Sequence, residues 1–272
     1  MSRIGIHIRL TSTINDVIEK AIRLNLPLFQ TFAVTDQGHV IKLEQHEVDS
    51  YLDLRRKHFK NLYLHSSYWV NLSRDNLRSY KTFLKELNLA QKLEFTHFIL
   101  HPGAAETKNK KETGILTLVK NLNTALANNP PLTILLENTA HGGRSIGSNL
   151  EDFKILLNEI KYPEKIQFCI DTSHAYAYGY DLANPEGLYQ FIETLKTTVT
   201  LEKIDLIHLN DTTENLGAKI DKHHEPGHGL IGKLALKNFI QHPDLKQIPI
   251  IMELPKLEEA DEIKIIQEVE NW

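Results

Sequence analysis

Cysteine is almost absent from this chain. Its 272 residues contain only one, Cys169, so no disulfide can form within the chain. Cys169 lies in the apolar stretch KIQFCI, which predicts a small buried side chain and not a thiolate ligand. Any metal site in this protein should therefore be built from nitrogen and oxygen donors.

Long apolar runs and an excess of positive charge are also missing. No run approaches the ~18 apolar residues of a membrane span. The opening MSRIGIHIRL alternates like a strand and has no apolar region or cleavage site typical of a signal peptide. We therefore expect a cytoplasmic protein with no membrane partner. The formal net charge of −4 provides no general basic surface for nucleic acid, so binding to DNA would require a local positive potential.

The chain does contain enough apolar sequence for a full core, with 41% hydrophobic and 24% charged residues. Eight short apolar runs are spread along it: RIGIHI, PLFQTF, NLYLHS, THFILHP, LTILLEN, KIQFCID, DLIHLND and IPIIMEL. Helix-length segments follow most of them, for example 75–92 and, after a predicted cap at Asn149, 151–160. This alternation favours a closed parallel barrel over an open doubly wound sheet. Because the length is near the roughly 250 residues of a (β/α)8 barrel, we predict an α/β protein with a single TIM-barrel domain over residues 1–272.

Six of the eight predicted strands end in a side chain that can bind a metal. These residues are His65, His101, Glu137, Asp171, His208 and Glu253. In a parallel barrel the C-terminal ends of the strands converge on one face, where the active site is built. One such residue alone is more often a hydrogen-bonded polar group. Six in the same phase would not arise from random placement, and they predict a metal site on that face.

Three further candidates follow in loops. His174 lies three residues after Asp171 and faces the same side if the chain turns helically there, whereas Asp221 and His223 share a side if their segment is extended. Both spacings suit ligation, and the second pair lies in the long irregular segment 210–230, which is typical of a functional loop. Eight of the nine other histidines are interpreted as solvent-facing, supporting or core groups: His7, His39, His46, His58, His97, His224, His228 and His242.

Nine candidate ligands exceed the need of one ion. A catalytic zinc takes about three protein ligands, so this set could hold two or three ions, especially if one carboxylate bridges. Three divalent ions would outweigh the four carboxylates of the set in charge and leave a local positive surplus. Such a site suits an anionic phosphodiester even in an acidic protein.

At this point the sequence resembles the endonuclease IV (deoxyribonuclease IV) family of apurinic/apyrimidinic-site endonucleases over nearly the whole chain. The segments that carry the resemblance are LHSSYWVNL, LHPG, LLENTA, IDTSHAYAYGYD, IHLNDT, DKHHEPGHGLIG and IMELP. The combination is highly specific, although each short piece is weak by itself.

The resemblance implies a trinuclear zinc site, with manganese as a possible alternative. Its ligands would be the nine residues named above: His65, His101, Glu137, Asp171, His174, His208, Asp221, His223 and Glu253. Glu137 would bridge two ions, one completed by His65 and His101 and the other by Asp171, His208 and Glu253. The remaining three residues would hold the third ion.

The implied reaction is hydrolysis of the phosphodiester 5′ to an abasic site, leaving a 3′-hydroxyl and a 5′-deoxyribose phosphate. Glu137 and Glu253 would be the catalytic carboxylates, with Glu253 helping to position the nucleophile. The implied partner is double-stranded DNA containing abasic sites, and we expect the protein to act as a monomer. Tyr68 is the implied DNA-contacting residue, inserted beside a flipped nucleotide; the alternative is a buried tyrosine of the barrel mouth.

Four segments depart from the family pattern: the family's GEG is Gly227-His228-Gly229 here, its ETP is Glu253-Leu254-Pro255, and two further segments bear on DNA contact. GIHIRLTST lacks the paired glycines of the family's opening, and FAVTDQGHV, residues 32–40, lacks the arginine that usually enters the duplex. The loss predicts weaker penetration of an intact duplex, so that nicked, gapped or frayed substrates should be favoured.

Two other functional classes fit part of the pattern. A sugar isomerase or epimerase on a xylose-isomerase-like barrel would use Glu137, Asp171, His208 and Glu253 for one or two ions, and it would leave the other five candidates unexplained. A catalytically silent binding barrel would predict gaps among the ligands, and the sequence has none.

Overall fold

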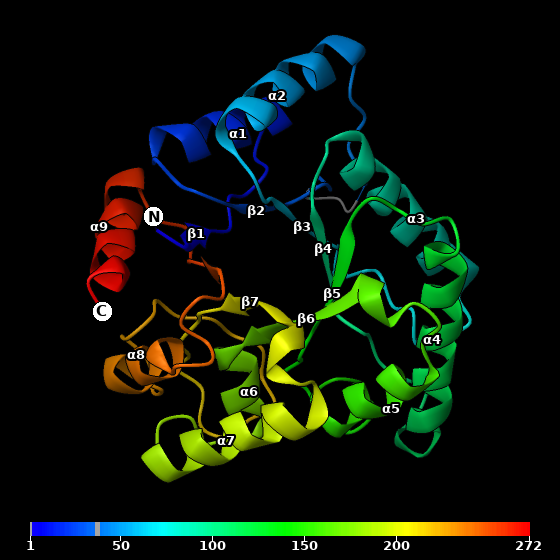
Figure 1. The fold of residues 1–272 in the computed structure, drawn as a ribbon, viewed down its shortest axis with the longest axis vertical. Helices are drawn as coiled ribbons and strands as arrows, with labels where there is room; N and C mark the ends of the chain where they lie inside the picture. Colours follow the sequence, from blue (N-terminus) through cyan, green and yellow to red (C-terminus); the bar gives the residue numbers. More distant parts are fainter. Residues whose placement is uncertain (1, 36–38) are drawn as a thin grey trace.

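Eight parallel strands form the centre of the molecule and confirm the predicted TIM barrel. The structure is a computed structural model that describes residues 2–35 and 39–272. The strands are β1 (Ile4–Ile6), β2 (Gln30–Phe32), β3 (Tyr63–His65), β4 (His97–Leu100), β5 (Thr133–Glu137), β6 (Ile166–Asp171), β7 (Ile204–His208) and β8 (Ile250–Met252). They pair in the order β1-β8-β7-β6-β5-β4-β3-β2. A parallel bridge between His7 and Gln30 brings β1 and β2 together and closes the ring (Figure 1).

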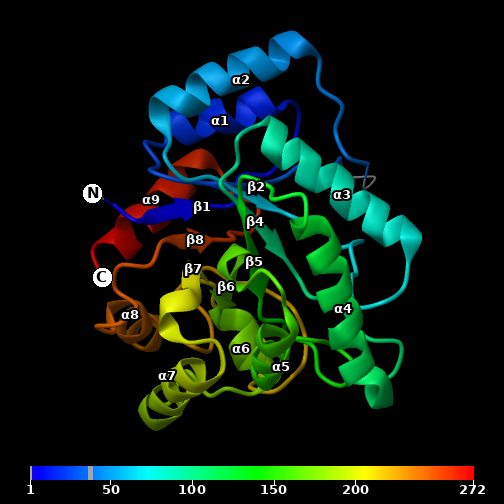
Figure 2. The same ribbon diagram turned by 45° about the vertical axis from the view of Figure 1, so that its right-hand side comes forward.

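Helices surround this sheet, as Figures 1 and 2 show from two directions. They are α1 (Ile14–Arg23), α2 (Gln45–His58), α3 (Leu77–Lys92), α4 (Lys111–Leu126), α5 (Glu151–Glu159), α6 (Thr172–Tyr178), α7 (Pro185–Thr198), α8 (Lys233–Gln241) and α9 (Glu259–Glu270). Short 3-10 turns occur at η1 (Lys108–Lys110), η2 (Pro163–Lys165) and η3 (Leu201–Lys203). The helices predicted at 75–92 and 151–160 are therefore α3 and α5. Asn76 caps α3, whereas Asn149 lies one residue before the N-cap of α5 and accepts a hydrogen bond from Glu151 N at 3.2 Å.

The side chains of the strands alternate between two cores. One set packs outward against the helices, and a smaller set fills the barrel interior. The interior set is Leu28, Tyr63, Ile99, Leu135, Cys169, Leu206 and Ile251. Cys169 is thus buried, as predicted. On β1 the inward position is Gly5, where an added Cβ would lie 2.2 Å from the carbonyl oxygen of Leu28, so only glycine lets β1 approach β2 this closely.

The same alternation builds the functional face. Because strand side chains repeat every second residue, the positions two residues beyond the interior set point into the barrel one layer higher. Counting from Gly5 onwards, they are His7, Gln30, His65, His101, Glu137, Asp171, His208 and Glu253. The six strand-end candidates are therefore neighbours in one layer, together with two residues that the sequence analysis had not assigned to the site.

Two remaining segments bear on the predictions. In the described part of the chain, no helix is both long enough and apolar enough to cross a membrane. In the segment 32–40, residues 36–38 lie outside the described residues. The predicted effect of its missing arginine therefore stays a prediction.

Candidate metal centre

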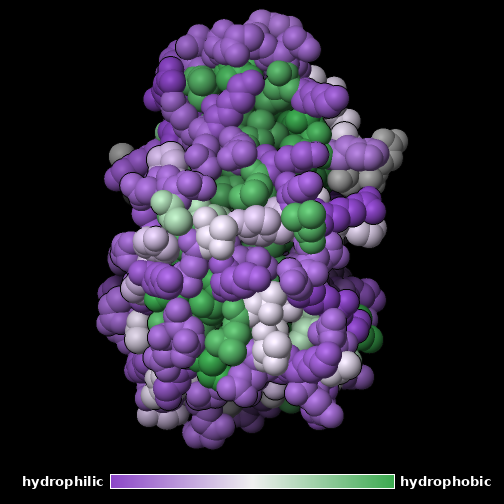
Figure 3. All heavy atoms as spheres, turned by 90° about the vertical axis from the view of Figure 1, so that its right-hand side faces the viewer, coloured by the Kyte–Doolittle hydropathy of each residue, from purple (hydrophilic) through white to green (hydrophobic). Residues whose placement is uncertain are grey.

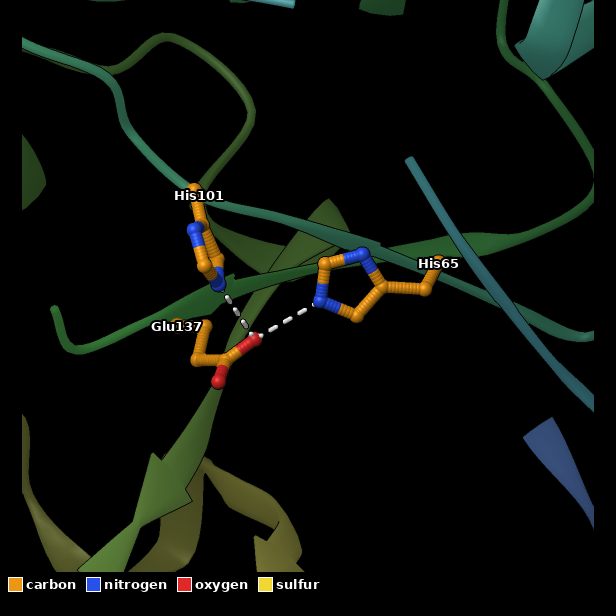
Figure 4. Close-up of side chains that lie close together, drawn as sticks. All are labelled: His65, His101 and Glu137. Carbon is orange, nitrogen blue, oxygen red and sulfur yellow. Dashed lines mark hydrogen bonds and ion pairs between the residues drawn. The ribbon is translucent and has the colours of Figure 1, made fainter. Parts of the chain in front are cut away.

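Glu137 lies at the centre of the layer, at the end of β5, and its carboxylate is fully buried. Its Oε2 atom is 3.0 Å from His65 Nε2 and 3.2 Å from His101 Nε2, as Figure 4 shows. Its Oε1 atom is 3.1 Å from His208 Nδ1 and 3.2 Å from His174 Nδ1. Each oxygen therefore faces a different pair of histidines, which is the arrangement required of a carboxylate shared by two ions.

A second group of donors surrounds His208. Its Nδ1 atom lies 3.7 Å from Glu253 Oε2 and 3.8 Å from Asp171 Oδ2, in addition to the contact with Glu137. The four residues place one ligand atom each within 4.8 Å of one another. They come from β5, β6, β7 and the residue after β8, so the parallel strands alone bring them together.

The third group joins α6 to the loop after β7. Asp171 caps α6 by accepting a hydrogen bond from His174 N at 2.7 Å, which is the helical turn predicted from their spacing. His174 Nε2 is 3.1 Å from Asp221 Oδ1 and 3.2 Å from His223 Nε2. His223 Nε2 is also 3.6 Å from Asp171 Oδ2. All nine candidate ligands thus meet in one cluster.

The donor set fits divalent metal ions. Two ligand atoms bound tetrahedrally to one zinc are about 3.3 Å apart, and the contacts within the cluster run from 3.0 to 4.0 Å. Glu137 and Asp171 are fully buried, and the described ion pairs of both carboxylates are with histidines alone. Buried carboxylates with so few compensating charges are typical of metal ligands. Cys169 also lies near Glu137 and His208, but burial raises the pKa of its thiol to about 12, so it stays neutral.

The carboxylates of the cluster stay ionised in spite of their burial. Burial opposes the charge on Glu137, but His208 and His101 outweigh it and hold the pKa of Glu137 well below its usual range. Burial likewise opposes ionisation of Glu253, and His208 and His223 lower its pKa to about 2. The cluster therefore presents charged oxygen ligands at neutral pH.

Hydrogen bonds outside the cluster orient the histidine rings. His65 Nδ1 lies 2.7 Å from the carbonyl oxygen of Ser66, and His174 Nδ1 lies 2.8 Å from that of Asn138. A carbonyl oxygen only accepts, so each of these ring nitrogens must carry the proton. The opposite nitrogen of each ring faces the cluster, where it would give its lone pair to a bound ion.

Gln30, on β2, orients the ring of His208 in the same way. Its fully buried amide oxygen accepts a hydrogen bond from His208 Nε2 at 2.7 Å, so His208 Nδ1 is the ring nitrogen that would supply a lone pair to a bound ion. Its amide nitrogen donates to Glu253 Oε1 at 2.7 Å and to His7 Nδ1 at 2.9 Å. Burial lowers the pKa of His7 to about 3, so His7 is the neutral acceptor that this bond needs. Sequence reasoning missed Gln30, because it lies two residues before the end of the predicted run PLFQTF and not at a strand end like the six candidates.

Asp211 anchors the loop that carries Asp221 and His223. Its buried carboxylate accepts hydrogen bonds from five backbone N–H groups, at 2.8 to 3.1 Å: those of Thr212, Gly227, Gly229, Ile231 and Gly232. A Cβ at Gly229 would lie 2.4 Å from Asp211 Oδ1, so glycine is needed there. The segment 210–230 is irregular, as predicted, but it is held on both sides of its candidate ligands.

An open pocket of about 560 Å³ leads from solvent to the cluster. His7, Phe32, Asp221, His223 and Glu253 are among its lining residues, and Arg9 and Lys222 add positive charge. Tyr68 and Trp69 also line it, and each side chain is 72% exposed. The interpretation of Tyr68 as a buried mouth residue was therefore wrong. Trp69 was missed, although it directly follows Tyr68 in the quoted motif.

Comparisons with known proteins agree with this architecture. Residues 18–270 match the family model of the xylose isomerase-like TIM barrel. A probable endonuclease 4 of Thermosipho africanus is 32% identical, over 99% of this chain and 98% of that protein. The crystal structure of endonuclease IV from Thermus thermophilus superimposes with a TM-score of 0.85 at 29% identity, covering 99% of both chains. A D-tagatose 3-epimerase-like protein also superimposes, with a TM-score of 0.72 and coverage of 99% of this chain and 97% of the other. At 18% identity this likeness shows the fold alone.

Proposed function

The chain belongs to the endonuclease IV family of xylose isomerase-like TIM barrels, and from that membership we propose that it hydrolyses the phosphodiester 5′ to abasic sites in double-stranded DNA. Water adds to phosphorus, the bond from phosphorus to the 3′ oxygen of the preceding nucleotide breaks, and that oxygen takes up a proton. The products are a 3′-hydroxyl and a 5′-deoxyribose phosphate. We also propose that the protein acts as a monomer formed by a single domain.

The observation that carries the proposal is the third group of donors. Four residues, Glu137, Asp171, His208 and Glu253, would satisfy a sugar isomerase, and they do form one group. His174, Asp221 and His223 have no role in such an enzyme, yet they converge within 3.4 Å of one another. A site with more than one ion suits the hydrolysis of a phosphodiester, because both the charge of the phosphate and the charge that develops on the leaving oxygen need neutralising.

The residues divide into three proposed ion sites. Glu137 is shared by the first two, with His65 and His101 on one side and Asp171, His208 and Glu253 on the other; His174, Asp221 and His223 make the third. Divalent ions bound there, zinc by donor type and manganese as the alternative, would activate water and neutralise the phosphate.

Glu253 is the residue we assign to positioning the attacking water. Its carboxylate lines the open pocket, so it can meet a water molecule that enters from solvent. Gln30 fixes its Oε1 atom, while its Oε2 atom is 3.3 Å from His223 Nδ1. An ionised carboxylate held from two sides keeps a fixed orientation, so a water molecule that donates to one of its free lone pairs would be positioned for in-line attack.

The test combines metal counting with a nicking assay on the same preparation. After dialysis, elemental analysis should find about three ions per chain, chiefly zinc, and the protein should nick a duplex that contains one abasic site. One tightly held ion, together with no nicking after zinc is added back, would instead support the sugar isomerase.

Tyr68→Ala should impair cleavage of an intact abasic duplex more than cleavage of a gapped one. The exposed ring of Tyr68 packs against Phe32 at the pocket rim, with ring centroids 5.6 Å apart, so it is placed to fill the helix when a nucleotide flips out. Loss of one base–aromatic stack should lower kcat/KM on the intact duplex roughly tenfold. Tyr68→Phe is the matched control, because it keeps the ring and should behave like wild type on both substrates. Equal losses on both would mean that Tyr68 belongs only to the pocket wall.

A further inference from the structure

A second hollow, of about 880 Å³, lies on the flank of the barrel between residues 39–42 and α3. Its lining residues are His39, Val40, Ile41, Lys42, Leu77, Arg78, Lys81, Thr82 and Lys85. Four of these side chains are permanently cationic, and among the described residues no aspartate or glutamate lines the hollow. We call this hollow the basic groove. Figure 3 shows the side of the molecule formed by α3 and α4, where hydrophilic residues predominate.

Three of the cations form a row along α3. Arg78, Lys81 and Lys85 are spaced three and four residues apart, so they project from one face of the helix. Seven residues of helix span about 10 Å, which is comparable to about three steps of a DNA strand at 3.4 Å each. Lys42 adds a charge from the opposite wall.

These cations are not used within the described part of the protein. Many exposed lysines elsewhere are paired with acids, such as Lys110 with Glu106 and Lys264 with Asp261, whereas no described ion pair involves the four groove residues. Arg74, one turn earlier, has a structural role, because it donates to the carbonyl oxygens of Ala104 and Ala105. The groove cations are therefore available to an external anion.

The basic groove and the pocket above the metal centre share a wall. Val34 and Thr35 line the pocket, and the same segment continues into residues 39–42, which line the groove. Its two ends are joined by an antiparallel bridge between Val34 and Val40 and by a 2.8 Å hydrogen bond from Thr35 N to the carbonyl oxygen of His39. A ligand that fills the pocket would thus continue over this wall into the groove.

We propose that the basic groove binds the phosphate backbone of the duplex that flanks the lesion. The inference rests on the proposed function, since it takes the substrate to be a duplex longer than the pocket. A protein with a net charge of −4 needs such a local positive surface to hold DNA. The two hollows lie on either side of the segment that contains Val34, Thr35 and residues 39–42, and a nucleic acid backbone is long enough to reach both, whereas a small anion would fill only one.

The test compares two double variants with the same change in charge. Lys81→Ala/Lys85→Ala removes half of the groove cations. The control, Lys57→Ala/Lys60→Ala, removes two exposed cations, one in the last turn of α2 and one between α2 and β3, at the opposite end of the barrel. Binding of an undamaged 30-base-pair duplex is measured between 50 and 200 mM salt. Each lost phosphate contact should make the slope of log K against log salt less steep by about 0.9. The slope of the groove variant should therefore be smaller in magnitude by roughly 2, and the slope of the control variant should equal that of wild type. Equal slopes in both variants would overturn the proposal.

A second measurement locates the contact. Abasic duplexes are shortened on one flank or the other, and wild type should lose affinity when the flank that reaches the groove is removed. The groove variant should show no further loss on that truncation, whereas the control variant should lose as much as wild type. The groove variant should keep its kcat at saturating substrate and show a raised KM. If wild type nicks the duplex normally and both variants lose the same affinity on truncation, the proposal that the basic groove binds DNA would be refuted. The proposed function would then still stand. Failure of wild type to nick any duplex would refute the proposed function.

Discussion

Glu137→Gln is expected to lower kcat/KM for the abasic duplex by roughly 10³-fold or more, and to lower the number of retained ions. The substitution keeps the size of the side chain but removes its charge. Both oxygens of Glu137 face two histidine nitrogens at 3.0 to 3.2 Å, so an amide would turn its NH₂ group toward one of these pairs. The effect should therefore extend to both of the ion sites that share this residue.

Glu262→Gln is the matched control for this experiment. Glu262 is also a buried glutamate, but it lies on α9 and pairs with Lys20 at 2.7 Å, away from the cluster. It should lose some stability and keep both its ions and its kcat. Retention of the full ion count and of nicking by Glu137→Gln would show that Glu137 does not bridge two ions.

Asp221→Ala and His223→Ala should each lower kcat/KM by about 10²-fold or more while the melting temperature hardly changes. Both side chains meet His174 above the barrel, at 3.1 and 3.2 Å, and neither belongs to the hydrophobic core. Each variant should also retain about one ion fewer than wild type, because the third group would be left with two donors.

His228→Ala controls for changes to the same loop. His228 is an exposed side chain of that loop, whose described contact is a 3.7 Å approach to Glu268, so its loss should change neither activity nor ion count. If Asp221→Ala and His223→Ala nicked DNA as well as His228→Ala does, the assignment of a third ion site would be wrong.

The barrel and its strand-end residues could be predicted from sequence because two regularities coincide: the alternation of side chains along each strand and the repetition of the same strand pattern around the barrel. A strand such as LTILLEN places Leu135 in the interior and Glu137 one layer above it, and parallel strands repeat this offset around the ring. No tertiary information is needed to infer that His65 and Glu253 approach each other. It is sufficient that a polar residue stands at the same position, near the C-terminal end, of most of the apolar runs.

The supporting residues could not be predicted in the same way. Gln30 is a neutral amide, and its importance depends on which atoms of His208 and Glu253 it meets across the barrel. Asp211 lies close to the metal ligands in sequence, yet its carboxylate turns away from them to backbone N–H groups up to 21 residues later. The exposure of Trp69 likewise depends on the path of the loop after β3, which hydrophobicity alone predicts poorly.

The backbone N–H groups gathered on Asp211 tie the chain at Thr212 and again at residues 227–232, on both sides of Asp221 and His223. Ordering a free segment costs about 1–2 kcal/mol per residue in backbone entropy. In a loop that closed only around its ligand, this loss would be subtracted from the free energy of binding. Here the loop loses this entropy when the protein folds and not when an ion binds, because the buried carboxylate of Asp211 accepts several backbone hydrogen bonds that hold the loop in place. The upper donors are therefore preorganised, and capture of an ion by Asp221 and His223 requires little more than rotation of their side chains.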